Sequence, residues 1–592
     1  MNFLIRKAKL VFLTVIVLSL SVFAQQKFVI NLNDRTNDTF KVTVYPKDLS
    51  SENNIFQFAS TAPGTYQIMN IGRFVKNFNA FNDNGDSLEV EKISTNQYKI
   101  KDPEDVYKIT YTISDTWDTP VQEHPVYPMA GTSIEEDHAL INGQAVFGYF
   151  WGKQSDQIFV KLEYPSNWTI GTALHTNSDG YYVAESYDYI VDSPILMGKL
   201  TKATTKIEDT DVNIYTYSKT GLIKSTDLLN VISDILDAES KFINGLPVKH
   251  YEFLFHFEDV TVGAWEHSYS SEYVYKEAPL TKPVIDGIKR VAAHEFFHIV
   301  TPLNIHSELV ENFNFVKPVL SQHLWLYEGV TEWAANIIQL RDSLMSLDGY
   351  LKTTSQKLIT NDFFDQSISL TELGLKATEL PQQYGNIYMK GAVIPTLLDI
   401  RLLELSKGKF GLRELLKELT NKYGKHKSFS EANFFNEIVD MTYPEIRDFI
   451  NKYIKGAEPL PTKEYFKKIG IDYFSVKGVD SSKASLGVQI GVKGQKLIIA
   501  KSHKSDQTGL LDGDIIEEVE GIKVTLQNAN QAFAKFAKLK VGDSMNFTLT
   551  RENKLVKVTS KISARENKHV FEVNPNATEE QLKLRKVWMK NL

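Results

Sequence analysis

Apolar and polar residues alternate with a period of two through the first third of the chain, from about residue 27 to residue 202. Short runs of β-branched and aromatic residues at 28–32, 40–45, 107–113 and 158–162 are separated by turn residues, as in the Asn-Asp-Asn-Gly-Asp stretch at 82–86. This alternation is typical of strands with one buried face. The pattern predicts an all-β, sandwich-like N-terminal domain over residues 25–205.

The period changes after about residue 205. Strand-like runs at 212–217 and 251–257 flank a helical stretch at 225–242, and helical periodicity then dominates from 284 to about 453. In residues 412–419 the apolar positions recur every three or four residues, as on one face of a helix. We therefore expect a second, mostly α-helical domain over residues 206–470.

A third unit is predicted over residues 471–565, with strands at 487–490, 496–500, 545–549 and 556–562 and a helix near 526–539. Its size and element order resemble a PDZ domain of the bacterial type. Such domains add a peptide as an extra strand and hold its C-terminal carboxylate in a loop, here Leu486, Gly487 and Val488. A rigid spacer whose groove is filled by the chain itself is an equally open interpretation.

The last segment, residues 566–592, is predicted to be a C-terminal tail that could form one helix. Glu579 and Glu580 would lie in its first turn, and Lys583, Arg585 and Lys586 follow later. This order of charges complements the helix dipole.

The first 24 residues have the pattern of a secretory signal peptide. Arg6, Lys7 and Lys9 precede an apolar run at 10–23, and a small residue, Ala24, offers a cleavage site. A membrane anchor is the alternative, but the run is shorter than the roughly 20 residues that span a bilayer. We expect an exported protein, periplasmic or secreted, without a stable membrane span after cleavage.

Composition narrows the possible chemistry. The chain has 66 Lys and Arg against 73 Asp and Glu, a net charge of −7, and 42% hydrophobic residues. These values exclude a disordered chain and a basic nucleic-acid binder, so no nucleic acid is expected as a partner. Cysteine is absent, which excludes disulfides and thiol catalysis. Any zinc site must use histidine and carboxylate ligands.

One pentapeptide meets that requirement: His294-Glu295-Phe-Phe-His298, in a predicted helix at 287–300. Residues four apart project from the same helix face, so His294 and His298 can share one metal ion. Glu295 lies beside them and can take a proton from an attacking water. The alternative is an ordinary helix with two hydrogen-bonded histidines.

A catalytic zinc ion needs a third protein ligand. The position that supplies it in metzincins is Asn304 here, and His306 and His323 stand in no recognisable frame. Glu328, in a second helical segment at 324–333, is the better candidate, giving two histidines and one glutamate around one zinc ion per chain. Glu332 could accept a hydrogen bond from a ligand histidine, although a solvated carboxylate is as good an interpretation.

Together these features resemble the glycyl aminopeptidase family. Gly263-Ala-Trp-Glu-His267 is similar to that family's Gly-Gly-x-Glu-His segment, and Tyr388-Met-Lys-Gly-Ala392 is similar to its Tyr-x-Lys-Gly-Ala segment. Residues 451–461 resemble the junction that leads into its PDZ domain. The resemblance implies a multidomain α+β protein: a β-rich N-terminal domain, a thermolysin-like zinc peptidase domain and a PDZ domain.

The resemblance also implies a role for each matched residue. It makes His294, His298 and Glu328 the zinc ligands, Glu295 the general base and Tyr388 the donor to the oxyanion. Glu266 would bind the free α-amine of the substrate, with Gly263 and His267 in the same pocket. Read without the family, Glu266 could form a strand-end salt bridge, and Tyr388 and His267 could be core residues.

The sequence therefore predicts a zinc-dependent aminopeptidase that hydrolyses peptides from the free N-terminus. Small N-terminal residues such as Gly or Ala are the family's preference, although Ala264 and the bulky Trp265 depart from its motif. A C-terminal peptide is the expected ligand of the PDZ domain. Two alternatives remain open: a zinc endopeptidase, and a catalytically silent exported protein that binds peptides through its PDZ domain.

Overall fold

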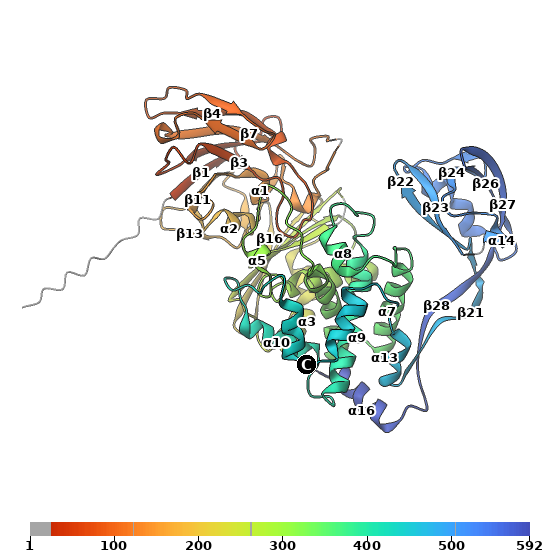
Figure 1. Ribbon diagram of the computed structural model, residues 1–592. Helices are drawn as coiled ribbons and strands as arrows, with labels where there is room; N and C mark the ends of the chain where they lie inside the picture. The colour runs from red at the N-terminus through yellow and green to blue at the C-terminus, as the bar shows by residue number, and fades with distance from the viewer. Residues whose placement is uncertain (1–24, 122, 261–262, 504, 592) are drawn as a thin grey trace, which may run out of the picture.

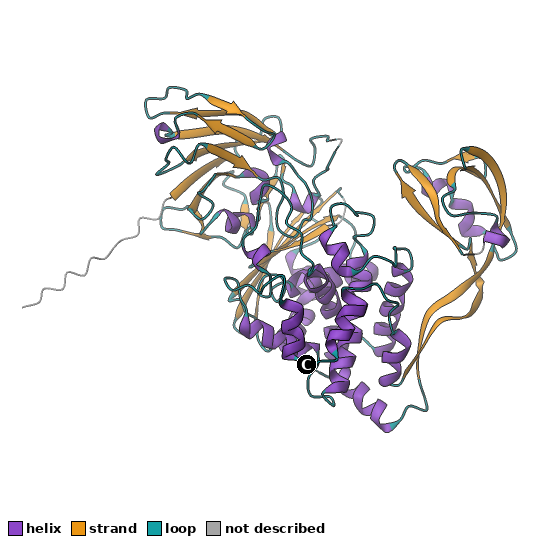
Figure 2. Cartoon of the chain, viewed as in Figure 1, coloured by secondary structure: helices purple, strands orange, loops and turns teal. Residues whose placement is uncertain are grey.

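The computed structural model describes residues 25–121, 123–260, 263–503 and 505–591, so the predicted signal peptide lies outside the described residues. Along the chain follow a sheet-rich N-terminal region, a middle region of helices around one sheet, and a small β-rich unit at the end of a two-stranded arm (Figure 1). Helices concentrate in the middle region (Figure 2). The fold is thus a mixed α+β, multidomain one, as the sequence predicts.

The N-terminal region contains three sheets. The largest follows the order β13 (His175–Thr176), β14 (Tyr182–Ala184), β11 (Gln157–Glu163), β1 (Gln25–Asn31), β2 (Thr39–Tyr45), β7 (Lys108–Ser114), β4 (Val75–Phe81). A second follows β10 (Gly148–Phe150), β3 (Ile55–Phe58), β6 (Gln97–Ile100), β5 (Val90–Lys92). The third follows β12 (Thr169–Gly171), β15 (Ile195–Gly198), β9 (His138–Ile141), β8 (Ser133–Ile134).

The first two of these sheets share one hydrophobic core. Phe28 and Val42 from the large sheet and Phe56 and Phe58 from the second sheet belong to the same buried cluster. The alternating burial of β2 and β11 is what a period-two sequence produces when one face packs against another sheet. The predicted turn is also present, since the Gly85 amide donates to the Asn82 carbonyl at 3.1 Å.

The middle region begins with a five-stranded sheet. Its order is β16 (Thr201–Ile207), β17 (Thr210–Ser218), β18 (His250–Glu258), β20 (Ser270–Lys276), β19 (Gly263–Glu266). Helix α3 (Ser225–Ile243) connects the parallel strands β17 and β18, which confirms the predicted strand–helix–strand order. The seven central residues of β18 are all buried, as expected for a strand covered on both faces.

The helices of the middle region cover one face of this sheet and share its core. The longer ones are α4 (Lys282–Phe297), α6 (Thr331–Arg341), α7 (Leu347–Asn361), α9 (Asn386–Leu405) and α10 (Leu412–Lys422). Shorter ones are α8 (Leu370–Leu375), α11 (Phe434–Met441), α12 (Ile446–Phe449) and α13 (Thr462–Lys468). None of the helices in the described part of the chain combines the length and apolar character that a membrane crossing requires.

The chain then leaves the helices along β21 (Ile471–Ser485) and returns along β28 (Ser563–Val573), and these two strands pair as an antiparallel arm. Between them lies a small sheet in the order β22 (Val488–Lys493), β23 (Lys496–Ser502), β24 (Ile515–Val519), β26 (Ser544–Arg551), β27 (Lys554–Lys561). Helix α16 (Glu579–Trp588) is the terminal helix that the charge pattern predicts.

One prediction for the small unit is wrong. Instead of one helix near 526–539, the chain forms α15 (Ala529–Ala532) followed by a 3₁₀ turn, Ala534–Lys538. Asn528 accounts for the later start of the helix, because its side-chain Oδ1 accepts from the Thr525 amide at 2.7 Å and its Nδ2 donates to the Lys523 carbonyl at 2.8 Å. Such side-chain bonds hold the preceding residues in a turn that competes with the helix.

Candidate active site

Two histidines come together at the end of α4. His294 lies in the last turn of the helix, and His298 is the residue immediately after it, still in a helical conformation. Their rings therefore project from one face, with centroids 4.9 Å apart and planes at 84°. Both side chains are buried, because α4 packs its apolar face into the main core.

Glu328 joins this pair from the next helical segment, a π-helical turn, Trp325–Val330, that leads into α6. One Glu328 carboxylate oxygen lies 3.3 Å from Nε2 of His294 and 3.7 Å from Nε2 of His298. The three donor atoms lie within 4.8 Å of one another, as donors around a single zinc ion must. Two imidazoles and one carboxylate fit zinc, and these are the three ligands predicted from the sequence.

The far side of each imidazole is also occupied. Nδ1 of His294 lies 3.0 Å from Glu332, and Nδ1 of His298 lies 2.9 Å from the Thr301 carbonyl. Because these oxygens accept, each Nδ1 donates and each Nε2 is left to face Glu328. Burial opposes the charged form of His294, yet its hydrogen bonds to Glu328 and Glu332 raise the pKa of His294 well above its usual value, so a metal ion bound there would displace the Nε2 proton. Burial lowers the pKa of His298 to about 4, so its imidazole is neutral, as a ligand must be.

Glu332 is itself paired with a cation. Nζ of Lys357, on α7, donates to the second Glu332 oxygen at 2.5 Å. Burial opposes ionisation of Glu332, yet the charge of Lys357 and the hydrogen bond to His294 hold the pKa of Glu332 far below its usual value. The carboxylate that orients His294 is thus kept ionised in a buried place.

A cavity of about 260 Å³ opens in front of these ligands, and Glu295 and Tyr388 both line it. Tyr388 comes from α9, with its ring centroid 5.7 Å from that of His294 and its hydroxyl 3.4 Å from that of Tyr384. Burial raises the pKa of Glu295 to about 7, with the charge of His294 opposing the shift and that of Glu328 adding to it.

Two glycines let the helices that carry Glu328 and Tyr388 approach closely. A Cβ added to Gly329 would lie 2.6 Å from the Gly391 carbonyl oxygen, and one added to Gly391 would lie 3.1 Å from Cα of Gly329. Any larger residue at Gly329 would push the backbones apart. Both glycines stand in the motifs that carry the candidate ligand and the candidate phenol.

Glu266 ends β19 at the edge of the cavity. Its carboxylate lies within 4.8 Å of donor atoms of both Glu295 and His298. Desolvation and the neighbouring charges of Glu328 and Glu295 raise the pKa of Glu266 well above its usual value. So many carboxylates in one cavity favour a cationic ligand.

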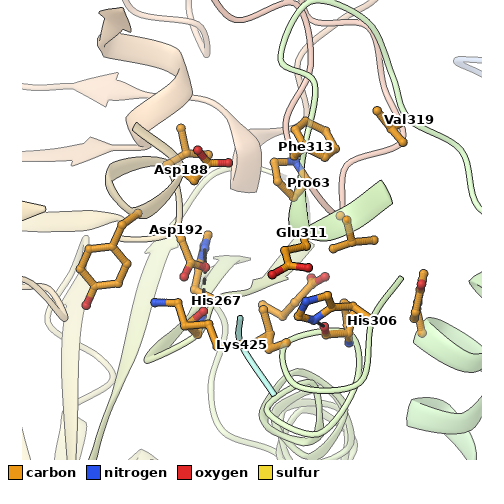
Figure 3. Close-up of a pocket in the computed structure, with 18 of the residues that line it drawn as sticks. Pro63, Asp188, Asp192, His267, His306, Glu311, Phe313, Val319 and Lys425 are labelled. Carbon is orange, nitrogen blue, oxygen red and sulfur yellow. Dashed lines mark hydrogen bonds and ion pairs between the residues drawn. The ribbon is translucent and has the colours of Figure 1, made fainter. Parts of the chain in front are cut away.

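The other two predicted pocket residues are not brought into this cavity. Gly263 begins β19 against Met129, whose sulfur would lie 2.8 Å from an added Cβ. His267 lines a neighbouring cavity of about 310 Å³, where its Nδ1 lies 3.6 Å from Asp192 (Figure 3). The two cavities meet, since Gly64, Trp265 and Glu266 line both.

The alternative ligands stay away from the metal site. Nδ1 of His306 lies 2.7 Å from the Pro302 carbonyl, in the neighbouring cavity (Figure 3). Nε2 of His323 lies 2.8 Å from the Glu431 carbonyl. His306 and His323 thus each bind a backbone carbonyl away from the candidate ligands.

Several residues at the site escaped the sequence analysis. Tyr66, on an N-terminal loop, packs against Tyr384 with ring centroids 5.8 Å apart and planes at 41°, and Gly64 nearby packs on Trp265 and Glu266. Tyr384 could have been predicted to lie near the site, because it precedes Tyr388 by one helical turn. Lys357 has none, since no pattern in α7 marks it.

The predicted peptide loop of the small unit lies at the start of β22. Leu486 is buried, Gly487 has a φ of +66°, and the Gly487 carbonyl accepts from the His503 amide at 2.9 Å. Gly487 and Val488 line a cavity of about 160 Å³. The next residue, Gln489, donates to the Asp362 carbonyl at the end of α7, at 3.3 Å.

Comparison with known proteins supports the resemblance seen in the motifs. The model of the Peptidase M61 N-terminal domain matches residues 27–199, and that of the M61 glycyl aminopeptidase matches residues 288–394, which include all three candidate ligands. No curated protein matches the sequence.

Among solved structures, an aminopeptidase N family protein from Idiomarina loihiensis is 19% identical, with a TM-score of 0.76, over 94% of this chain and 99% of that chain. At this identity the likeness is one of fold. Native yeast LTA4 hydrolase is 14% identical over 74% of this chain and 68% of its own, with a TM-score of only 0.45. The chain thus matches the M61 N-terminal domain and the M61 glycyl aminopeptidase domain over these two stretches, in line with the resemblance that its motifs show.

Proposed function

We propose that this protein is a zinc-dependent aminopeptidase that hydrolyses peptides from their free N-terminus. The observation that carries the proposal is the cavity in which the His294, His298 and Glu328 donors meet Glu295, Tyr388 and Glu266. The family match supports the reaction class, and the donor set supports zinc.

Zinc bound there would act as a Lewis acid toward the scissile carbonyl and the attacking water. Glu295 would accept the proton of that water and pass it to the leaving amine. Tyr388 would donate a hydrogen bond to the oxyanion of the tetrahedral intermediate. Glu332 and Thr301 would hold the two imidazoles in the required tautomer.

Glu266 would bind the α-ammonium group of the substrate. A carboxylate fixed close to Glu295 places a charged N-terminus next to the reacting carbonyl, and this selects exopeptidase cleavage. Gly64 and Trp265 close the cavity beside Glu266, which supports a preference for small N-terminal side chains such as those of Gly or Ala.

The test is an assay of the chain from Gln25 onward on aminoacyl amides, each with a free and with an acetylated N-terminus. We expect one zinc ion at this site and cleavage of free amides only, abolished by a chelator and restored by zinc. Glu266→Gln should lower kcat/KM for free amides while leaving zinc content unchanged. Equal cleavage of acetylated amides would favour an endopeptidase, and bound zinc without any cleavage would favour the silent peptide-binding protein.

For the small unit we propose a PDZ-like role in which β22, an outer strand of its sheet, adds a peptide strand. The loop of Leu486, Gly487 and Val488 would receive the peptide's C-terminal carboxylate. Binding of peptides with free and amidated C-termini tests this, because only the free form should bind. Export to the periplasm or the medium, with cleavage before Gln25, completes the proposal, and N-terminal sequencing of the exported protein tests it.

A further inference from the structure

His256 is an unusual buried residue. It lies in the middle of β18, it is fully buried, and neither ring nitrogen has a hydrogen-bond partner among the described residues. Burying an imidazole without a partner for either nitrogen is unfavourable, because water would have satisfied both. A bound ion or molecule that is not part of the protein would give these nitrogens a partner.

Two further donors stand beside it. Side chains alternate across a strand, so Glu258 projects from the same face of β18 as His256, away from the helices and toward the N-terminal region. His138, the first residue of β9, reaches them from that region. Its Nε2 lies 3.6 Å from a Glu258 oxygen, and donor atoms of all three residues lie within 4.8 Å of one another.

The surrounding contacts orient these donors toward a common point. Nδ1 of His138 lies 2.9 Å from Asp137, which leaves Nε2 with its lone pair facing Glu258, and that Nε2 has no other partner in the described chain. Lys219 bonds one Glu258 oxygen at 2.9 Å and leaves the other facing His138. A carboxylate behind the distal nitrogen is the usual arrangement around a zinc-bound histidine.

We propose that His138, His256 and Glu258 bind a second zinc ion, with water as the fourth ligand. Its role would be structural, because none of these residues lines a described cavity and the donors join a strand of the N-terminal region to the central sheet. The inference does not depend on the proposed peptidase activity.

The competing explanation is aromatic packing alone. His138 stacks on Tyr217 at 3.8 Å, and Trp117 stacks on His256 at 5.0 Å, so the rings fill the space well. Packing explains why aromatic rings lie here, but it does not explain why residue 256 is a histidine. A phenylalanine at this position would fill the same space, and its burial would cost no hydrogen bonds to water. The two explanations therefore make opposite predictions for His256→Phe.

The test is to count zinc in the full mature chain, loaded with zinc and then freed of excess, for three proteins. The unmodified chain should hold two ions, His256→Phe one, and His294→Ala one. His256→Phe should also melt at a lower temperature than the unmodified chain and keep full peptidase activity. If His256→Phe does not fold, Glu258→Gln takes its place and should likewise hold one zinc ion.

Two results would overturn the proposal. One is a single zinc ion in the unmodified chain that is lost entirely in His294→Ala. The other is a zinc content that stays at two in His256→Phe or in Glu258→Gln. Because the His294→Ala arm reports on the first site alone, failure of the second site and failure of the proposed active site are distinguishable.

Discussion

The described part of the chain contains two His-His-Glu clusters whose imidazole rings are arranged in nearly the same way. The rings of His294 and His298 lie 4.9 Å apart at 84°, and those of His138 and His256 lie 4.8 Å apart at 86°. In each cluster a glutamate oxygen lies less than 4 Å from a histidine Nε2. The donor sets alone therefore do not distinguish a catalytic centre from a structural one.

What differs is the surroundings. The first cluster faces a cavity that is also lined by Glu295 and Tyr388, the proposed base and hydrogen-bond donor. In the second, the ring of His256 lies against those of Trp117 and Tyr217, with centroids 5.0 Å and 5.1 Å away. The comparison teaches that the groups beside the ligands, and the space in front of them, decide whether a metal centre can be catalytic.

The largest effect is expected from exchanging one carboxylate at each cluster for an amide: Glu295, which lies beside the first cluster, and Glu258, which belongs to the second. Glu295→Gln should lower kcat by about 100-fold or more and keep both zinc ions, because it removes only the base. Glu258→Gln should keep kcat and lose one zinc ion. Steady-state kinetics and metal analysis of both variants check this. A loss of activity in Glu258→Gln as large as that in Glu295→Gln would break the distinction between the clusters.

The close approach of the two helices is expected to matter for the first cluster alone. Gly329→Ala should lower kcat/KM by about 100-fold, because displacing a catalytic group by about 1 Å costs that much. Gly391→Ala should cost less, since its Cβ meets a Cα at 3.1 Å rather than a carbonyl at 2.6 Å.

The matched control for this pair is Gly287→Ala, in α4, where an added Cβ has nothing within 4 Å. It should leave the kinetics unchanged and raise stability slightly, as alanine does in helices. If Gly391→Ala proved worse than Gly329→Ala, the steric argument for the placement of Glu328 and Tyr388 would fail.

Smaller effects on zinc affinity are expected from replacing the residues that bind the far side of the clusters. Lys357→Met should weaken zinc binding at the first site about 10- to 100-fold, because Glu332 loses the cation that keeps it ionised. Asp137→Asn should weaken only the second site, where Asp137 orients His138. Competition with a chelator of known affinity measures both constants. Weakening of both sites by one variant would show that the clusters are coupled.

The smallest effect is expected from removing the small β-rich unit that lies between the two strands of the arm. Ser485 and Ser563 pair across the arm, so a short glycine linker can replace residues 486–562 between them. Both clusters lie outside the excised residues, so zinc content and cleavage of aminoacyl amides should stay within about twofold, in line with a change far from the bound groups. A loss of cleavage would mean that the unit completes the active site.

Local patterns predicted much of this molecule. The proposed ligands His294 and His298 are one helical turn apart in one helix, and β17, α3 and β18 follow from apolar periodicity alone. Glu328 was proposed because it stands in a second helical segment and completes a set of two histidines and one glutamate. In each case the signal lies in the residues next to the position concerned.

Contacts between distant segments were not predictable in this way. Nothing near Lys357 indicates that it will meet Glu332, and His138 and His256 lie on strands that only the packing of two regions brings together. Apart from Ile471, no residue of the β21–β28 arm is buried, so no buried face marks its strands. Its pairing depends on the chain returning to the helices.

That return gives the last residues of the chain a structural role. Trp588 is fully buried, its carbonyl accepts from Nε of Arg341 at 3.0 Å, and Arg341 forms a buried ion pair with Asp399 at 2.6 Å. The small β-rich unit is therefore an insertion whose two connecting strands, β21 and β28, both join the helical region. A protease that cuts one strand of the arm would leave two fragments bound to each other, whereas removing the final helix would expose the core beneath α9.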